Sequence, residues 1–165
     1  MAENRRSRRT TWFAYAACAW AFIFAAFSFY WAAGGMIGVE TLGESMARLA
    51  AAHDSELITL TWITGVLKVI AGLLALTLVQ RWGRVFPRWL LRLAAWGAGL
   101  LFLGYGIINV IQHAIMILDP SQIGELLGSA NAVRWHLALW DPFWMIGGLL
   151  FIGAAFMFGR ESSAS

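Results

Sequence analysis

Residues 57–79, LITLTWITGVLKVIAGLLALTLV, contain one charged side chain, that of Lys68, in an otherwise uncharged and mostly apolar run. A helix of about 20 apolar residues is long enough to cross the roughly 30 Å hydrocarbon core of a bilayer. The lysine costs roughly 3 kcal/mol on an insertion scale, and the many Leu, Ile and Val residues offset that cost. We therefore predict a membrane-spanning helix with an ammonium group near its middle, a position that indicates function by default.

Three further apolar stretches of similar length occupy most of the remaining chain: residues 12–33, 93–118 and about 137–158. With 60% hydrophobic residues, 13% charged residues and a mean hydropathy of +0.67, the composition is that of a multi-pass membrane protein. The predicted fold is all-α, an integral membrane four-helix bundle that forms one domain over residues 12–158. A basic head, residues 1–11, precedes this domain, and a polar tail, residues 159–165, follows it.

The arginines gather in segments that would face one side of the membrane. Most of them precede the first span, separate the second from the third, or follow the fourth: Arg5, Arg6, Arg8, Arg9, Arg81, Arg84, Arg88, Arg92 and Arg160. The two other loops hold only Arg48 and Arg134, and they carry acidic residues: Glu40, Glu44, Asp54, Glu56, Asp119 and Glu125. Basic loops mark the cytoplasmic side, so both termini are predicted to be cytoplasmic. The basic pI near 9.6 reflects this topology, and nucleic-acid binding is not expected.

Small residues follow one face of the first predicted span, at alternating spacings of four and three: Ala14, Cys18, Ala21, Ala25, Ser28 and Ala32. In lipid, small residues at helical spacing let two helices approach closely, so we interpret Cys18, the single cysteine, as a packing residue. Most tryptophans fall near the predicted ends of spans, as interfacial residues do. Trp20 is the exception, and we predict that it is buried within the bilayer.

The surroundings of Lys68 are predicted from the direction of its helix. Side chains tilt toward the N-terminus of their helix, so Lys68 points toward the outer face. The third span carries a polar patch in its outer half, and Asn109 is the predicted neighbour of Lys68, followed by Tyr105 and His113, with Gln112 in the same patch. No acid of the chain is expected at this depth. Lys68 would then be neutral, hydrated through a vestibule, or bound to an anion.

Asp141, directly before Pro142, is the nearest carboxylate within a span, and two interpretations of it stay open. Aspartate followed by proline is a common helix start, which would make Asp141 the cap of a short fourth helix beginning at Pro142. Alternatively, the helix begins near Arg134, and Pro142 kinks it so that Asp141 points into an outer vestibule, toward Lys68 and His113.

The loop before the second span contains a short amphipathic pattern. Leu42, Met46 and Leu49 share one helical face, and the opposite face carries charged residues. We predict a short interfacial helix there, which could cover the vestibule either as a lid or as a plain loop.

Motifs along the chain together carry a family resemblance: FYWAAGG at 29–35, TGVLKV at 64–69, WGR at 82–84, QH at 112–113, and RWH at 134–136 leading to WDPFW at 140–144. They resemble a domain-of-unknown-function family of small four-helix integral membrane proteins from bacteria, largely actinobacteria. The resemblance covers essentially the full chain. It implies a bacterial cytoplasmic membrane location and the four-helix topology, and it implies no activity.

We favour a binding or transport protein with an outward-facing polar vestibule. In it Lys68 supplies positive charge, a set of third-span side chains supplies hydrogen bonds, and an aromatic rim surrounds the opening: Asn109, Gln112 and His113, then Tyr30, Trp31 and Trp140. The ligand would be a small anion, a lipid head group or a proton.

Two alternatives remain. A haem or other redox protein could use His113 and His136, or His113 with Asp141 as an acid–base pair, although His136 is expected at the membrane surface and His113 deeper. No metal-ligand motif is present, so no metal and no cofactor are predicted. The other alternative is an accessory subunit, in which Lys68 pairs within the bilayer with an acid of a partner; self-association is also open.

Overall fold

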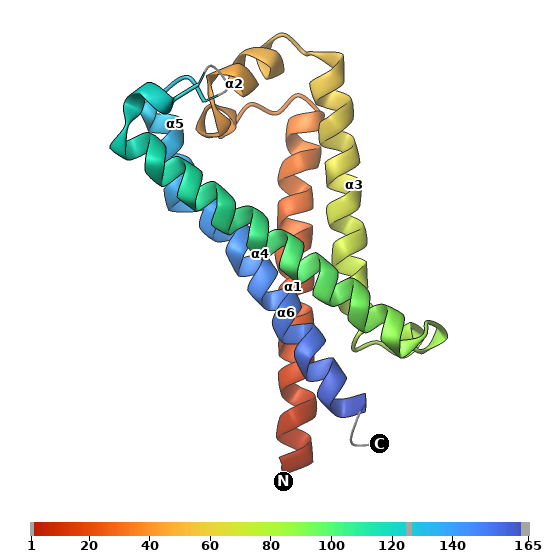
Figure 1. The fold of residues 1–165 in the computed structure, drawn as a ribbon. Helices are drawn as coiled ribbons and strands as arrows, with labels where there is room; N and C mark the ends of the chain where they lie inside the picture. The colour runs from red at the N-terminus through yellow and green to blue at the C-terminus, as the bar shows by residue number, and fades with distance from the viewer. Residues whose placement is uncertain (1, 125–126, 163–165) are drawn as a thin grey trace.

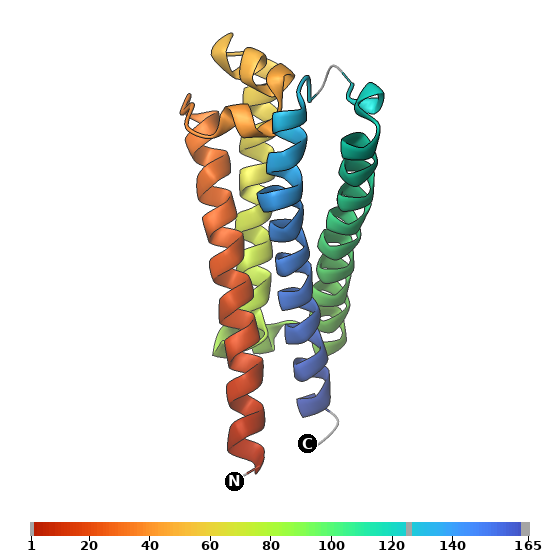
Figure 2. The ribbon, with the colours of Figure 1, turned by 90° about the vertical axis from the view of Figure 1, so that its left-hand side faces the viewer.

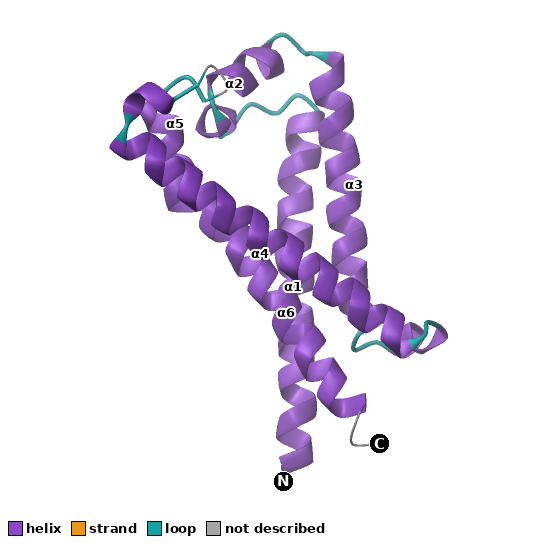
Figure 3. Ribbon diagram, viewed as in Figure 1, coloured by secondary structure: helices purple, strands orange, loops and turns teal. Residues whose placement is uncertain are grey.

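The computed structural model describes residues 2–124 and 127–162, with side chains from residue 11 to residue 160 within those ranges. Four long helices dominate it: α1 (Ala2–Ala32), α3 (Ser55–Thr77), α4 (Arg88–Leu118) and α6 (Asp141–Ser162). A short helix, α5 (Ala130–Trp135), continues into α6 through a π turn, η4 (His136–Trp140). Shorter helices lie in the loops: η1 (Val39–Leu42), α2 (Glu44–Ala51), η2 (Arg81–Val85) and η3 (Pro120–Gln122). The described ranges contain helices and loops and no strand (Figure 3).

Four segments are long and apolar enough to cross a membrane: Thr11–Ala32, Ser55–Thr77, Arg88–Leu118 and Ala130–Arg160. The predicted all-α, multi-pass membrane fold is therefore confirmed. The last two segments begin earlier than the predicted residues 93 and 137. Pro87 precedes the first turn of α4, and the Ser129 hydroxyl caps α5 by accepting a hydrogen bond from the Ala132 amide.

The two termini lie at the same end of the bundle (Figures 1 and 2). The predicted basic head belongs to α1, whose backbone is helical from Ala2. The side chains of residues 1–10, which include four of the arginines used to predict orientation, lie outside the described residues, as do Glu125 and the end of the predicted tail, residues 163–165. The cytoplasmic position of both termini stays a prediction.

The long helices pack as two pairs, α1 against α3 and α4 against α6, and α1 also contacts α6 (Figures 1 and 2). A Cβ atom at Gly148 of α6 would lie 2.4 Å from the backbone nitrogen of Leu103 in α4, so a larger residue cannot fit without moving a helix. A Cβ atom at Gly72 of α3 would meet side chains of α1, the nearest being the ring of Phe22 at 3.1 Å. The α4–α6 contact is therefore between backbones, whereas side chains mediate the α1–α3 contact.

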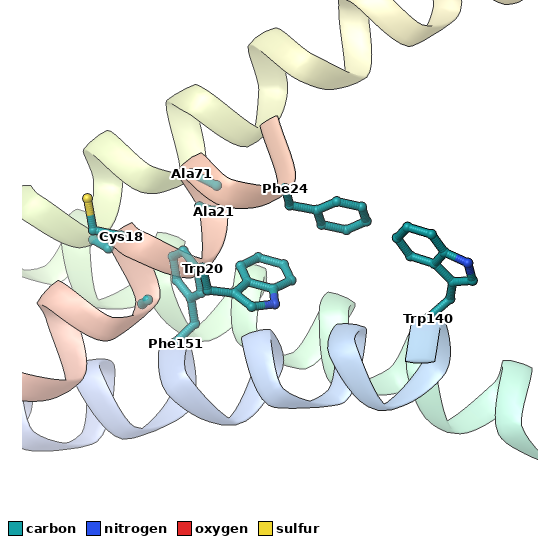
Figure 4. Close-up of a cluster of buried hydrophobic side chains, with 9 residues drawn as sticks. Cys18, Trp20, Ala21, Phe24, Ala71, Trp140 and Phe151 are labelled. Carbon is teal, nitrogen blue, oxygen red and sulfur yellow. The ribbon is translucent and has the colours of Figure 1, made fainter. Parts of the chain in front are cut away.

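The small-residue face of α1 is buried along its whole length, as predicted. Trp20 is buried, also as predicted, and its Nε1 donates a hydrogen bond to the carbonyl oxygen of Phe143 at 2.8 Å. Figure 4 shows Trp20 beside Phe151 of α6 and Phe24 facing Trp140 of η4, with ring centroids 6.4 and 6.3 Å apart. Aromatic side chains of α1 thus join the two helix pairs in the middle of the bundle.

The loop between α1 and α3 covers the end of the bundle opposite the termini, with η1 and α2 lying across it (Figure 1). α2 is the short helix predicted from the spacing of Leu42, Met46 and Leu49. Leu42 of η1 and Met46 of α2 line a small hollow of about 50 Å³ beneath this cover, whereas Leu49 is 39% exposed.

Candidate functional site

Three ionisable side chains meet near the covered end of the bundle: His113 of α4, His136 of η4 and Asp141 of α6, here called the His–Asp–His cluster. The Nδ1 atom of His113 lies 2.7 Å from Oδ2 of Asp141, and Nδ1 of His136 lies 3.7 Å from Oδ1 of the same carboxylate. The imidazole ring centroids are 4.6 Å apart. Asp141 is 1% exposed, so its carboxylate is buried between two imidazoles.

The π turn brings His136 next to Asp141. In a regular α-helix, residues five apart point about 140° away from each other around the axis. In η4 the Asp141 amide instead donates to the His136 carbonyl, five residues back, and this wider turn stacks the two residues. The wider turn also accommodates Pro142, whose ring would clash with a carbonyl of the preceding regular turn. Of the two interpretations of Asp141, the structure therefore has the continuous helix: Asp141 points at His113 and does not cap a helix.

The close approach of α4 to α6 positions His113. A Cβ atom at Gly106 of α4 would lie 3.0 Å from the backbone carbonyl oxygen of Asp141, so the two backbones almost touch beside the cluster. His113 follows Gly106 by about two turns and lies on the same face of α4. The glycine contact therefore holds the His113 imidazole within hydrogen-bonding distance of the carboxylate.

The loop that covers the bundle also contacts the cluster. His136 Nε2 lies 3.3 Å from the carbonyl oxygen of Leu42, and the Nε1 of Trp140 donates to the Thr41 hydroxyl at 3.0 Å. Thr41 in turn donates to the Gly38 carbonyl oxygen at 2.6 Å. These hydrogen bonds hold η1 over the cluster, in which the side chain of His136 stays 19% exposed.

Tyr30, Trp31 and Trp140, the predicted aromatic rim, all bind this covering loop. The Ile37 amide donates to the Tyr30 hydroxyl at 3.2 Å, and Trp31 Nε1 donates to the Ile37 carbonyl oxygen at 3.0 Å. Trp140 is 7% exposed, because its ring packs between Phe24 and Trp31. In this structure these three residues hold the cover in place.

Lys68 has a different neighbourhood from the one predicted. Its Nζ donates to the Ser28 hydroxyl at 2.6 Å and lies 3.9 Å from the centroid of the Phe24 ring. The described residues show no hydrogen bond between Lys68 and the predicted neighbour Asn109, because α3 packs mainly on α1 and Lys68 bonds to Ser28 there. Within the described residues, no carboxylate bonds to the ammonium group.

Of the polar patch predicted on α4, only His113 joins the cluster. Tyr105 is half exposed and packs edge-on against Trp144, with ring centroids 4.9 Å apart. Asn109 is partly buried and Gln112 is exposed, and neither side chain makes a hydrogen bond within the described part of the chain. The four residues are predicted to act together because they share one face of α4. Where α4 packs on α6, only His113 of the four reaches the cluster.

Sequence reasoning missed the partners that matter most in the structure: Thr41 above the cluster, Ser28 beside Lys68, and the closeness of His136 to His113. The predicted difference in depth between the two histidines is wrong, since their rings nearly touch. One nitrogen from each histidine and a carboxylate oxygen of Asp141 all lie within 4.8 Å of one another, a grouping that could hold a metal ion. The sequence signal for this grouping is the five-residue spacing between His136 and Asp141, directly before Pro142. In a regular helix, two residues at that spacing are not neighbours.

The family resemblance is confirmed by comparison with known proteins. A family model described as "Protein of unknown function (DUF3995)" matches residues 21–151, a range that includes Lys68 and all three members of the cluster. No curated protein and no solved structure matches the chain.

Proposed function

We propose that this chain, which belongs to DUF3995, a family of proteins of unknown function, is a membrane protein that binds a divalent transition-metal ion at the His–Asp–His cluster. The observation that carries this proposal is a buried carboxylate, that of Asp141, flanked by two imidazole nitrogens. Such a charge inside a membrane span is costly and marks a site.

The contact between His136 and Asp141 favours a cation between them. The Nε2 of His136 faces the Leu42 carbonyl oxygen, which only accepts hydrogen bonds, so a proton on Nε2 satisfies this contact. With that tautomer the other nitrogen, Nδ1, is an acceptor, and it lies 3.7 Å from Oδ1 of Asp141. Two acceptors this close are stabilised by a proton shared between them or by a metal ion.

The distances suit a metal ion. Zinc binds histidine nitrogen and aspartate oxygen at about 2.0–2.2 Å, so two such bonds, meeting at an open angle, span the gap between His136 and Asp141. The Leu42 carbonyl on the far nitrogen of His136 is the kind of outer hydrogen bond that orients a ligating histidine. Two imidazoles and one carboxylate are ligands that zinc and other first-row transition metals share.

Metal binding at the cluster has to compete with protons. At 2.7 Å from an acceptor-only carboxylate oxygen, the Nδ1 of His113 carries a proton that a ligating nitrogen must lose. We therefore expect metal uptake to release protons and the affinity to fall by about tenfold for each pH unit below neutrality, if one proton is displaced. Titrations with Co²⁺ across a pH series measure this slope, and a flat profile would contradict it.

The direct test is metal binding by the purified full chain in detergent. After treatment with a chelator, the wild type is expected to bind one Co²⁺ ion per chain and to show its visible absorbance. Asp141→Asn and His136→Gln should each weaken binding by about 100-fold or more, because each removes a ligand, and tryptophan emission should show that both variants are folded.

The third histidine provides the matched control. His53 is exposed and has a φ of 50°, a conformation that asparagine also adopts, so His53→Asn removes a histidine without disturbing the cluster. This variant should bind Co²⁺ like the wild type. Failure of the wild type to bind, or equal loss in His53→Asn and Asp141→Asn, would rule the proposal out.

A second candidate is binding or transport of a small anion at Lys68. The observation that favours it is the positive charge of Lys68, whose described contacts are a hydroxyl and two aromatic rings. An acid supplied by a partner subunit would meet the same need. Native mass spectra of the wild type and Lys68→Met distinguish these outcomes: a bound anion or partner that disappears in the variant supports this candidate, and identical spectra argue against it.

A further inference from the structure

A second polar hollow lies at the end of the bundle opposite the His–Asp–His cluster. It has a volume of about 480 Å³ and is lined by three arginines, Arg81 and Arg84 of η2 and Arg88 of α4. α1, α3 and α6 complete its wall, with Thr11, Thr77 and Phe158 among the contributing residues, and none of the lining residues is acidic. Among the residues whose side chains the structure describes, the lining of the hollow is therefore positive and carries no carboxylate.

The fold holds the arginines around this hollow. A Cβ atom at Gly83 would lie 1.9 Å from the Thr77 carbonyl oxygen, so only glycine lets η2 fold back directly onto the end of α3. Arg81 and Arg84, on either side of Gly83, are carried into the wall by this turn. From the other side, the guanidinium carbon of Arg88 lies 5.3 Å from the centroid of the Phe158 ring.

The same segment exposes large apolar side chains. Trp82 is 46% exposed, Val85 83% and Trp89 68%. Each directly follows one of the three arginines in the chain, so charged and apolar side chains alternate along the segment. In a membrane protein, exposed tryptophans at the end of a span lie at the level of the lipid head groups, and the arginines beside them then lie at the level of the phosphates.

We infer that this cavity binds the phosphate of an anionic phospholipid head group. Arginine matches phosphate because its planar guanidinium donates two parallel hydrogen bonds to it. Cavities of about 300–1,000 Å³ hold small molecules of this size, and basic hollows between membrane helices are suited to anionic head groups. The exposed Trp82, Val85 and Trp89 would lie against the same lipid layer, so this segment would bind the lipid through charged and apolar side chains together.

Native mass spectrometry of the purified full chain in detergent tests the inference. With dioctanoyl phosphatidylglycerol the wild type should carry one tightly bound lipid, and with dioctanoyl phosphatidylcholine at the same concentration it should carry none. The double change Arg84→Gln and Arg88→Gln should weaken phosphatidylglycerol binding by about 30-fold, because each arginine near an anionic lipid adds about 1 kcal/mol to the binding free energy. The double change Arg84→Lys and Arg88→Lys keeps the charge and loses the paired hydrogen bonds, so its loss should be intermediate.

The charge-matched control removes two arginines at the other end of the bundle. Arg48 and Arg134 are both exposed there, and the double change Arg48→Gln and Arg134→Gln should leave phosphatidylglycerol binding within about threefold of the wild type. Equal loss in both glutamine pairs, or equal binding of both lipids, would overturn the inference. Inorganic phosphate that binds as tightly as phosphatidylglycerol would show a site for free phosphate instead, and would overturn its assignment to a lipid.

Discussion

Two charged side chains within the spans of this bundle are stabilised in opposite ways. Asp141 of α6 is buried and faces two imidazoles that can carry compensating protons. Lys68 of α3 is only partly buried and contacts one hydroxyl and two aromatic rings, and the described residues give it no carboxylate. The first site can be electrically balanced by the chain alone, whereas the second keeps a positive charge that only deprotonation or an outside anion can remove.

This difference follows from how the two helix pairs pack. Backbone contact between α4 and α6 at glycines fixes side chains on facing helices at hydrogen-bonding distance, so an acid and two histidines can act as one unit. In the α1–α3 pair, side chains fill the space between the helices, and among the described residues the hydrogen bond of Lys68 is to Ser28 of the small-residue face. The tightly packed α4–α6 pair therefore holds a cluster of polar side chains, and the more loosely packed α1–α3 pair holds a single charged side chain.

The largest expected effect is the loss of the carboxylate at Asp141. With metal removed by a chelator, Asp141→Asn should destabilise the protein by about 3 kcal/mol, because it leaves two buried imidazoles without their charged partner. Thermal unfolding in detergent measures this. Asp54→Asn is the control, since Asp54 caps α3 and asparagine caps a helix equally well, so its stability should be close to that of the wild type. Equal melting temperatures for both variants would show that the cluster does not hold the helices together.

A smaller effect is expected from adding one methyl group to each helix pair. Gly148→Ala pushes against the backbone of Leu103 and should cost about 1–3 kcal/mol, whereas Gly72→Ala meets side chains that can move and should cost less. Gly104→Ala serves as the control, because nothing lies within 4 Å of its added atom and alanine favours a helix by up to about 1 kcal/mol. Equal losses of stability in Gly148→Ala and Gly72→Ala would contradict a difference in packing between the two helix pairs.

The smallest effect concerns the hydrogen bond between Lys68 and Ser28. Ser28→Ala should cost about 1 kcal/mol, because the ammonium group loses its hydroxyl partner, while Lys68→Met alone should leave stability unchanged or slightly raised. In the double variant, Ser28→Ala should cost nearly nothing. Chemical denaturation of the four proteins gives the coupling energy, and additive changes would mean that the two side chains do not depend on each other.

The fold could be predicted from the sequence because hydrophobic length is a direct physical requirement of the bilayer. The spacing of small residues likewise identified the buried face of α1, since packing in lipid selects for it. The partners across helices could not be predicted, because helix pairing is not encoded in the pattern of a single span. Depth, side-chain direction and the polar patch predict a neighbour of Lys68 on α4, yet its ammonium group bonds to Ser28 on α1.

The histidine cluster shows a second reason why a site escapes sequence reasoning. Regular helices make neighbours of residues three and four apart, and His136 and Asp141 are five apart. Only the π turn before Pro142 brings them together. Pro142, for which the sequence leaves a helix start and a kink open, follows an irregular turn inside one continuous span.

That turn also divides the fourth span mechanically. A π turn followed by proline has fewer ordinary hydrogen bonds to resist bending than the α-helix after it. His136 contacts the covering loop, whereas Asp141 packs on α4 beside Gly106. A bend of the fourth span at this turn would therefore change the distance between His136 and the pair His113 and Asp141, and it would have to loosen the packing of α5 on α4.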